Sequence, residues 1–492
     1  MHMKDRARKQ LAKDAGFHYS ALYTHQFHKK YPVDFTLLIQ KYLEEDEKIP
    51  KINHRKTLSG GRTNATRLYY HCEPDEKIEY YDVNGLYPYV LMSKRYPTCH
   101  PTYFTPAASD NPVEFFLNGT HEWFGLVQCT ILPPRHLSIP VLELKVDERL
   151  TFPLCNTCVH EKSNSFCSHS DEERALSGTW TTNAIHYAIQ CGYTLLSVKQ
   201  IEHYQSSADA ENNPFHAFIK RCMEKKKEAQ IQNNSSARSL AKLVANAFWG
   251  KLATNADRPR LAFVKTDEEL LALATDSSIR IYDTVDLGTL LRVTYRTKDD
   301  FIKTPPYTSL ISAIFVTDYA RLELLKYLHV IPEDNLLYFD TDSVIFKQKR
   351  NDPLPFTNIG IECGQMASEL EPGEEIDCFG STGPKSYFYS IRKNTEELEI
   401  KVKIKGLSLT KEILKDCFKT DNGMDYLIDF LKKNYTENGE INDPILVPQL
   451  QMRPLNTSQV VVREFDKSFG NEYYKRRIVN DFKTLPWGYC AL

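Results

Sequence analysis

The sequence contains no apolar run long enough for a transmembrane helix and no N-terminal signal peptide. Its first residues, MHMKDRARKQLAKDAG, are charged and lack the apolar core of a secretory signal. The net charge of −2 gives no global basic field, although a local basic groove over an acidic site would average out in this sum. We therefore expect an intracellular protein without a membrane partner, and its compartment, nuclear or other, stays open.

Cysteine is sparse, with 12 residues in a chain of 492, so a disulfide scaffold is not indicated. Most of these side chains should be free thiols or metal ligands. No internal repeat and no long low-complexity linker interrupts the chain. The length favours about two to four domains or one large multi-lobed enzyme, and an apolar fraction of 41% is sufficient for a hydrophobic core.

The stretch NLLYFDTDSVIFK, residues 335–347, places two carboxylates in apolar surroundings. Like charges in such a place repel each other and are costly to bury. We predict a β-hairpin whose arms anchor it in a sheet and whose turn carries Asp340 and Asp342. A divalent cation would compensate the repulsion, and the hard carboxylate oxygens favour Mg²⁺.

A second strand, in IEYYDVNGLYP, ends on Asp82 in the same way. A two-metal site needs a carboxylate from elsewhere in the chain, and Asp82 is the candidate. Turn chemistry or a cap would explain a single aspartate at a strand end. Two such strand ends weaken that explanation, so we expect Asp82, Asp340 and Asp342 to converge across adjacent strands.

Two helices joined by the turn NNSS are predicted between Asn213 and Thr254, and so short a connection indicates an antiparallel hairpin. In the second helix Arg238, Lys242 and Asn246 fall at i, i+4 and i+8, on one face. Two cations and an amide in a row suit a triphosphate, although an ordinary amphipathic helix shows the same pattern. The residues expected on the buried side are apolar: Leu240, Leu243, Val244 and Phe248. TSLISAIFVTDYARLELLKYL is expected to form one more helix, beneath the strands.

Several of these stretches resemble motifs of the family B DNA polymerases, and they come in the family's order. DVNGLYP resembles the first polymerase motif, Asp-x-x-Ser-Leu-Tyr-Pro, and KLVANAFWGK resembles the second, Lys-x-x-x-Asn-Ser-x-Tyr-Gly. YFDTDS matches Tyr-x-Asp-Thr-Asp-Ser at every fixed position, and GPKSYFY resembles the Lys-x-Tyr motif that follows it. SGGRT looks like the Gly-Gly element of the protein-primed branch, which serves viruses, linear plasmids and self-synthesising transposons. The ordered set, from residue 55 to the end, is far more specific than any one motif.

The resemblance implies an α+β right-hand polymerase fold with an antiparallel-sheet palm, helical-hairpin fingers and a thumb. It implies a DNA-directed DNA polymerase, a nucleotidyltransferase that uses two Mg²⁺ ions in the replication of a mobile or viral-type element. Its expected partners are a DNA primer-template, dNTPs and a terminal (priming) protein. The expected domains are 1–58 as an N-terminal remnant or linker, 59–213 as the first part of the palm with a Cys-rich insertion at 155–169, 214–254 as fingers, 255–399 as the second part of the palm, and 400–492 as thumb.

The resemblance also implies roles for single residues. The catalytic carboxylates would be Asp82, Asp340 and Asp342, with the two Mg²⁺ ions held by Asp82 and Asp342. Tyr87 would pack beneath the sugar and exclude a 2′-hydroxyl. The other residues that would contact the incoming nucleotide or the nascent base pair are Arg238, Lys242, Asn246 and Trp249. The residues that would contact the primer end or the template backbone are Lys385, Tyr387, Gly60 and Gly61.

The chain departs from the family pattern in places. Gly85, Ala247 and Trp249 stand where the family motifs have Ser, Ser and Tyr, which leaves the metal site whole but puts the checking of the base pair in doubt. The Asp-x-Glu signature of the family's proofreading exonuclease does not occur in residues 1–80, and these residues leave no room for that domain. The sequence thus resembles a polymerase without its exonuclease: a fragment, a truncated gene model or a decayed mobile element.

Two other functions remain open at this stage. One is a catalytically silent, mobile-element-derived protein that binds nucleic acid without copying it. The metal ligands should be lost early in such decay, and all of them are intact. The other is a reverse transcriptase, which also carries paired aspartates on a hairpin, and Thr341 in YFDTDS distinguishes this sequence from that class.

The segment CNTCVHEKSNSFCSH has the spacing Cys155-x2-Cys158-x8-Cys167-x-His169. A CxxC pair followed by Cys and His can bind zinc, although the second pair is unusually close. Four protein ligands would make such a site structural, and His160 could replace one of them. The alternative is a loop with buried free thiols. Ser170 and the acidic residues after it predict the start of a helix.

Overall fold

The computed structural model describes residues 52–105, 111–118, 122–393, 398–407, 409–420, 424–435, 443–454, 460–470, 473–480 and 482–491. The chain divides into residues 1–53 and 54–492, and the fold described here is that of the second unit. Most of the expected remnant or linker, 1–58, lies outside the described residues. Its described part contains the short helix α4, His54–Thr57.

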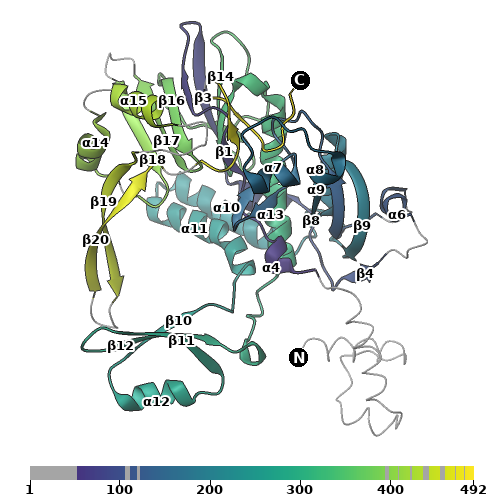
Figure 1. Cartoon of the computed structure of the whole chain (residues 1–492), viewed down its shortest axis with the longest axis vertical. Coiled ribbons are helices and arrows are strands. Elements are labelled where there is room, and N and C mark those ends of the chain that lie inside the picture. The colour runs from purple at the N-terminus through teal and green to yellow at the C-terminus, as the bar shows by residue number, and fades with distance from the viewer. Residues whose placement is uncertain are drawn as a thin grey trace. The chain divides into compact units, whose positions relative to one another are not determined.

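A nine-stranded sheet forms the centre of this unit (Figure 1). The strand order is β1-β13-β14-β3-β16-β17-β18, with β15 paired to β3 and β2 paired to β16, and these strand pairs are antiparallel. The strands are β1 Thr63–Ala65, β2 Tyr69–His71, β3 Glu76–Val83, β13 Leu336–Asp340, β14 Ser343–Lys349, β15 Met366–Ser368, β16 Glu375–Gly383, β17 Ser386–Arg392 and β18 Leu398–Ile404. The hairpin predicted at 335–347 is therefore confirmed as β13 and β14.

The apolar arms of this hairpin are explained by burial on both faces of the sheet. Phe339 and Val344 pack into a core on one face, together with Val83. Tyr338 and Ile345 pack into a second core on the other face. Strands covered on both faces need apolar residues at successive positions rather than at alternate ones, which is the pattern of Leu336–Asp340.

Helix α13, Leu310–Val330, packs into the same core as Phe339 and Val344, as the sequence predicted. Ser309 caps its first turn by accepting a hydrogen bond from the backbone N–H of Ser312. Much of its length is buried, including Phe315, Val316 and Leu324. The short helix α5, Leu86–Ser93, follows β3 directly and packs against α13.

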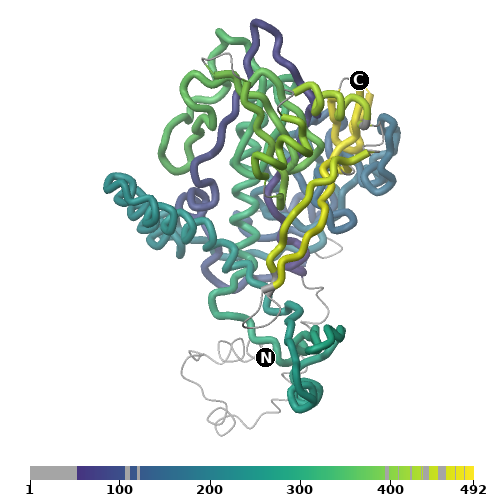
Figure 2. Tube along the Cα trace, turned by 90° about the vertical axis from the view of Figure 1, so that its left-hand side faces the viewer, coloured from purple at the N-terminus to yellow at the C-terminus, as the bar shows by residue number. Residues whose placement is uncertain are grey.

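The two helices predicted between 213 and 254 are α10, His216–Ile231, and α11, Ser235–Leu252. They pack against each other and project from the body of the molecule (Figure 2). The expected buried side of α11 is wrong for three residues, because Leu240 and Leu243 are 62% and 64% exposed and Val244 is also exposed. A projecting hairpin offers few partners to these side chains, so hydrophobicity alone did not predict their burial. Phe248 is half-buried against the core.

Two smaller sheets lie inside the segments expected to form the palm. One has the order β4-β9-β5-β8, from Thr102–Phe104, Thr194–His203, Gly125–Leu132 and Leu176–Thr181, and the helices near it are α6, Pro112–Asn118, and α9, Thr182–Gln190. The other has the order β10-β12-β11, from Arg260–Val264, Leu291–Thr297 and Ile279–Asp286, with α12, Asp267–Thr275. The linking segments contain β6 Leu144–Val146, β7 Arg149–Thr151, α7 Asn156–Glu161, α8 Asp171–Arg174 and the 3₁₀ turns Asp299–Phe301 and Glu333–Asn335.

The last part of the chain has two portions. Helices α14, Lys411–Phe418, and α15, Asp425–Asn434, pack with the hairpin of β19, Ile445–Pro454, and β20, Val460–Phe469, in a core to which β16, β17 and β18 of the central sheet also contribute. Residues 473–491, here called the C-terminal segment, contain β21, Arg477–Ile478, and β22, Thr484–Leu485, and return to the central sheet. Within the described residues, no helix combines the length and the apolar character that crossing a membrane requires.

Candidate functional site

Asp82, Asp340 and Asp342, here called the carboxylate cluster, meet at one end of the central strands. Asp82 in β3 is the register partner of Ser343, the first residue of β14. The backbone N–H of Val83 donates to the carbonyl oxygen of Asp342 at 2.7 Å. Strand pairing therefore brings the end of β3 against the β13–β14 turn, and the predicted convergence is confirmed.

The carboxylate cluster concentrates negative charge in a poorly hydrated place. Burial, together with the charges of Asp342 and Glu369, raises the pKa of Asp82 to about 8. Burial, together with the charge of Asp340, raises the pKa of Asp342 to about 6. Without a cation, bound protons would neutralise part of this negative charge. A cluster in this electrostatic setting favours a divalent metal.

Lysines from three other elements surround the carboxylate cluster. The Nζ of Lys385, in the β16–β17 turn, lies 2.5 Å from Oδ1 of Asp340. The charges of Lys242 in α11 and Lys403 in β18 both lower the pKa of Asp82, against the larger effect of burial. Lys403 and Glu369 were missed by the sequence analysis, because only the pairings of β18 and β15 bring them here.

Tyr87 lies beside the carboxylate cluster and stacks on Trp249. Their ring centroids are 5.0 Å apart and the ring planes differ by 12°. Burial and then the charge of Asp342 raise the pKa of Tyr87 to about 12, so its hydroxyl is neutral at physiological pH. Gly85, which replaces the family's Ser, has φ +58°, a conformation that glycine adopts without strain.

The cationic side chains of α11 lie close to a further lysine, Lys226, in α10. Arg238 and Lys242 are exposed, and Asn246 is half-buried one turn further along. Burial and the charges of Arg238 and Lys242 lower the pKa of Lys226, so the three cations share one surface. The sequence analysis missed Lys226, whose only signal was its place in the basic run that begins at Lys220.

Lys385 and Tyr387 are neighbours in sequence but differ in their surroundings. Lys385 has φ +62° in its turn, and its backbone N–H donates to the Tyr338 hydroxyl at 2.8 Å. Tyr387 is buried, with its hydroxyl 2.9 Å from that of Tyr80. The side chain of Tyr387 therefore lies in the core beneath the turn, while that of Lys385 reaches the carboxylate cluster.

Residues 59–62, here called the glycine segment, press directly on the β13–β14 turn. The backbone N–H of Thr341, at φ +60°, donates to the carbonyl oxygen of Arg62 at 2.7 Å. A Cβ built at Gly61 would lie 2.9 Å from Cγ2 of Thr341, whereas one built at Gly60 would meet nothing within 4 Å. A side chain at Gly61 is thus excluded by Thr341 of the same chain, so the glycine is explained without a bound template.

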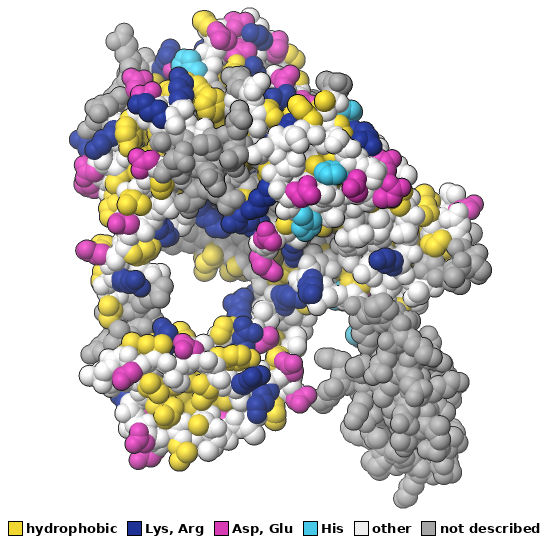
Figure 3. Space-filling model, viewed as in Figure 1, with side chains coloured by type: hydrophobic (Ala, Val, Ile, Leu, Met, Phe, Trp, Pro, Cys, Tyr) yellow, Lys and Arg dark blue, Asp and Glu magenta, His cyan; other side chains and the backbone are white. Residues whose placement is uncertain are grey.

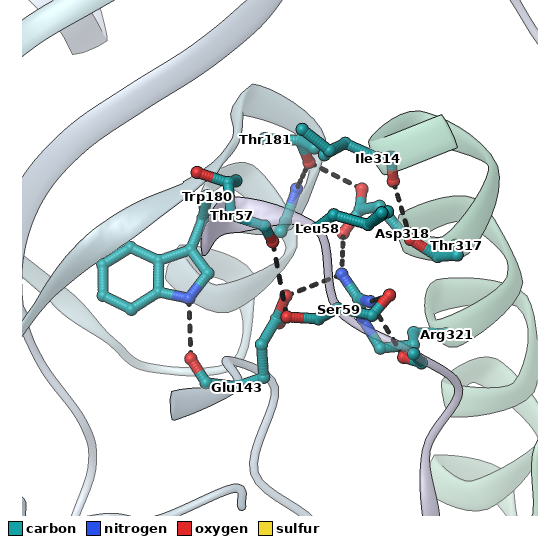
Figure 4. Close-up of polar contacts among 12 residues, drawn as sticks. Thr57, Leu58, Ser59, Glu143, Trp180, Thr181, Ile314, Thr317, Asp318 and Arg321 are labelled. Atoms are coloured by element: carbon teal, nitrogen blue, oxygen red, sulfur yellow. Dashed lines mark hydrogen bonds and ion pairs between the residues drawn. The ribbon is translucent and has the colours of Figure 1, made fainter. Parts of the chain in front are cut away.

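A buried polar network holds the glycine segment from its other side (Figure 4). Arg321 of α13 donates to the carbonyl oxygens of Ser59 and Gly60 at 3.2 and 3.1 Å. Its guanidinium also pairs with Glu143 at 2.7 Å and with Asp318 at 3.3 Å. Burial raises the pKa of Asp318 to about 6, against the opposing charge of Arg321. The network thus fixes the backbone on which the Thr341 turn rests.

The candidate zinc ligands Cys155, Cys158, Cys167 and His169, here called the cysteine cluster, also converge. Their potential ligand atoms all lie within 4.8 Å of one another. His160 is not one of this set and is exposed. The predicted helix after Ser170 is α8, which begins with a capping box formed by Ser170 and Glu173.

The family model for DNA polymerase type B, organellar and viral, matches residues 7–331. A probable DNA polymerase of Neurospora intermedia is 23% identical over 401 residues, which cover 77% of this chain and 36% of that protein. The DNA polymerase of Bacillus phage Nf is 24% identical over 292 residues, which cover 59% of this chain and 42% of the phage protein. The chain therefore spans less than half the length of these two relatives.

Solved structures of phi29 DNA polymerase share the fold. The complex with primer-template DNA matches with a TM-score of 0.52 and 16% identity, covering 94% of this chain and 66% of that chain. The ternary complex with incoming nucleotide substrates also has a TM-score of 0.52, with 15% identity over 88% of this chain and 66% of that chain. These matches confirm the predicted α+β polymerase fold. Because the family model covers well over half of its residues, the chain belongs to the organellar and viral type B DNA polymerases, in agreement with its resemblance to the protein-primed branch.

Proposed function

We propose that this chain is a DNA-directed DNA polymerase that adds deoxynucleotides to a primer 3′ end at the carboxylate cluster. The observation that carries the proposal is the convergence of Asp82 with Asp340 and Asp342, from β3 and the β13–β14 turn, next to the cations of α11. Membership of the type B family supports the reaction class. The names of the phage and fungal relatives support it as well.

The residues present fit two Mg²⁺ ions. Asp82 and Asp342 are partly buried carboxylates whose pKa values are raised by burial and then by neighbouring negative charge, and they would hold the ions together with substrate phosphates. When bound, the ions would lower the pKa of the primer 3′-hydroxyl and stabilise the leaving pyrophosphate. Asp340 pairs with Lys385 and would shape the site without a ligand role of its own.

The side chains of α10 and α11 would bind the incoming dNTP. Arg238, Lys242 and Lys226 would neutralise the triphosphate. Because these cations are in position before the reaction starts, they would not have to reorganise as charge develops in the transition state. Tyr87, backed by Trp249, would form a rigid wall under the sugar and exclude a 2′-hydroxyl. Asn246, a turn from Lys242, would lie near the nascent base pair.

The primer and template would lie across the central sheet. Lys385 would steady the primer end from its turn, and Tyr387 would act on it indirectly, through the core that supports this turn. Gly60, whose surroundings are open, would allow the template backbone to approach closely. Figure 3 shows Lys and Arg side chains on the rim of an opening beside the β19–β20 hairpin, and such a rim suits a phosphate backbone.

We assign the nine-stranded sheet to the palm, α10 and α11 to the fingers, and α14, α15 and the β19–β20 hairpin to the thumb. The protein would serve the replication of a mobile or viral-type element, and a terminal protein would supply the primer. The boundaries proposed for the fingers follow the bounds of α10 and α11. The expected start of the thumb, residue 400, falls inside β18, so the thumb would begin after that strand, and the C-terminal segment would belong with the palm.

Primer extension tests this proposal. A labelled DNA primer is annealed to a DNA or an RNA template, and each dNTP is offered singly with Mg²⁺. The proposal predicts addition of the complementary dNTP alone, with faster addition on the DNA template. A folded protein that binds the primer-template and adds nothing would instead support the silent nucleic-acid-binding alternative.

A further inference from the structure

We propose that the cysteine cluster binds one structural Zn²⁺ and that this zinc site fastens the C-terminal segment to the palm. The inference goes beyond the polymerase activity and does not depend on it. It rests on the positions of four potential ligand atoms and on the contacts between the residues that bear them and residues 487–490.

The geometry of the cysteine cluster is that of a tetrahedral site. The Nδ1 atom of His169 lies 3.5, 3.3 and 3.6 Å from the Sγ atoms of Cys155, Cys158 and Cys167. In a regular tetrahedron with Zn–S near 2.3 Å and Zn–N near 2.0–2.1 Å, the S–N edges are about 3.6 Å. The three S–N separations therefore match those that one zinc ion requires, and all four ligand atoms lie within 4.8 Å of one another.

The surroundings of the cysteine cluster enclose its ligands, and a backbone hydrogen bond favours a thiolate at Cys155. The three cysteines are buried, and His169 is half-buried. Cys155 caps α7, and its Sγ accepts a hydrogen bond from the backbone N–H of Cys158 at 3.4 Å. Such a bond stabilises a thiolate. With four protein ligands the ion has no site for substrate, so its role is structural.

Charged neighbours complete the site. Nε2 of His169, the ring nitrogen that faces away from the sulfurs, lies 4.0 Å from a carboxylate oxygen of Glu161. A carboxylate that accepts a hydrogen bond from this nitrogen would orient a zinc-bound histidine, and Glu161 is placed to do so after a small side-chain movement. Three thiolates and one Zn²⁺ leave a net negative charge. The guanidinium of Arg477 lies close by, stacked on Phe166 at 4.1 Å and donating to the carbonyl oxygen of Asn164 at 3.3 Å. Arg477 belongs to the C-terminal segment.

The C-terminal segment lies directly on the cysteine cluster. The backbone N–H of Leu154 donates to the carbonyl oxygen of Trp487 at 2.7 Å, and that of Cys167 donates to Tyr489 at 3.1 Å. A Cβ at Gly488 would lie 2.3 Å from Cβ of Cys155, so the two backbones are in close contact. Figure 2 shows this end of the chain beside the segment that carries the cysteines.

The same segment also supports the strand next to the catalytic hairpin. The hydroxyl of Tyr473 donates to Oδ1 of Asn64 at 2.6 Å, and that of Thr484 donates to the carbonyl oxygen of Ala65 at 2.7 Å. Both acceptors lie in β1, whose Thr63 is the register partner of Asp340. Loss of zinc should therefore release residues 484–491 first and loosen β1 second.

Zinc analysis of the purified full chain tests the site. We expect about one zinc per chain in the wild type and in Cys490→Ser, a matched control whose thiol is buried in the same hydrophobic cluster but is not among the four ligands. We expect almost none in the double variant Cys155→Ser, Cys158→Ser. No zinc in the wild type, or equal zinc in the double variant, would overturn the proposal.

A second measurement uses only the wild type, in case the double variant does not fold. Alkylation is mapped before and after a chelator removes zinc, with the exposed Cys99 as an internal standard that reacts in both states. Cys155, Cys158 and Cys167 should react only after chelation, and amide exchange in 484–491 should rise more than in α13. Cysteines that stay unreactive after the zinc has gone would refute the site, and unchanged exchange in 484–491 would refute the fastening role.

Discussion

The carboxylate cluster and the cysteine cluster both gather side chains that attract cations, but their surroundings differ. The carboxylates are met by lysines from α11, β18 and the β16–β17 turn, and two of them have raised pKa values. The cysteines and His169 are enclosed by backbone and by residues 487–490. An open set of hard ligands among cations suits exchangeable metal and a charged substrate, whereas a closed set of soft ligands suits a permanent ion.

The largest effect on stability is expected at the buried network beside the carboxylate cluster. Arg321→Gln would leave Asp318 and Glu143 buried without their cation, at a cost of about 3–5 kcal/mol in the free energy of unfolding. Urea denaturation measures this loss. Arg350→Gln is the matched control, because Arg350 pairs with Glu375 on the surface and should lose less than about 1 kcal/mol. Equal losses in the two variants would show that the network does not support the turn.

The next largest effect is a fall in kcat, which should differ between substitutions of Gly61 and Gly60. Gly61→Ala would push a methyl group into Thr341 and displace the turn that carries Asp340 and Asp342. A displacement of about 1 Å in these carboxylates should lower kcat by about 100-fold. Gly60→Ala meets no protein atom, so its kcat should fall far less and any effect should be on template affinity. Equal falls in kcat for both variants would place the constraint in the bound template instead.

Part of this arrangement could be predicted from the sequence because it depends on contiguous residues. The β13–β14 hairpin has apolar arms and two aspartates within thirteen residues, so its element type and its charge problem are both visible. Lys226, Lys403 and Glu369 could not be found in this way. Their approach to the site depends on which elements pair, and the alternation along one strand does not specify its partner.

The C-terminal segment also makes long-range contacts that local sequence patterns do not predict. Residues 400–492 were expected to form one thumb, but 473–491 return to β1 and to the cysteine cluster. Spacing identified the four zinc candidates, whereas the contact with Trp487 and Gly488 is a long-range one that no local pattern records. Likewise, the apolar face of α11 predicted burial that the projecting hairpin does not provide.

A smaller and more selective effect is expected at Tyr87. Tyr87→Val would remove the ring that stacks on Trp249 and open space beside Asp342. Selection of dNTPs over rNTPs should weaken by about 10- to 100-fold, since a steric wall discriminates by a few kcal/mol, while extension with dNTPs survives. Tyr89→Val, the same substitution in the same helix, should keep the wild-type preference. Competition between labelled nucleotides measures the ratio, and an unchanged ratio in Tyr87→Val would show that selection lies elsewhere.

The account depends most on the catalytic role of the carboxylate cluster, and Asp342→Asn tests it most directly. Mg²⁺-dependent primer extension is measured under single-turnover conditions, together with the melting temperature of the metal-free protein. We expect extension to be abolished and the melting temperature to be equal to or higher than that of the wild type, because the amide removes one of the repelling charges that raise the pKa of Asp82. Extension within about tenfold of the wild-type rate, a change of only about 1.4 kcal/mol in the barrier, would contradict the account.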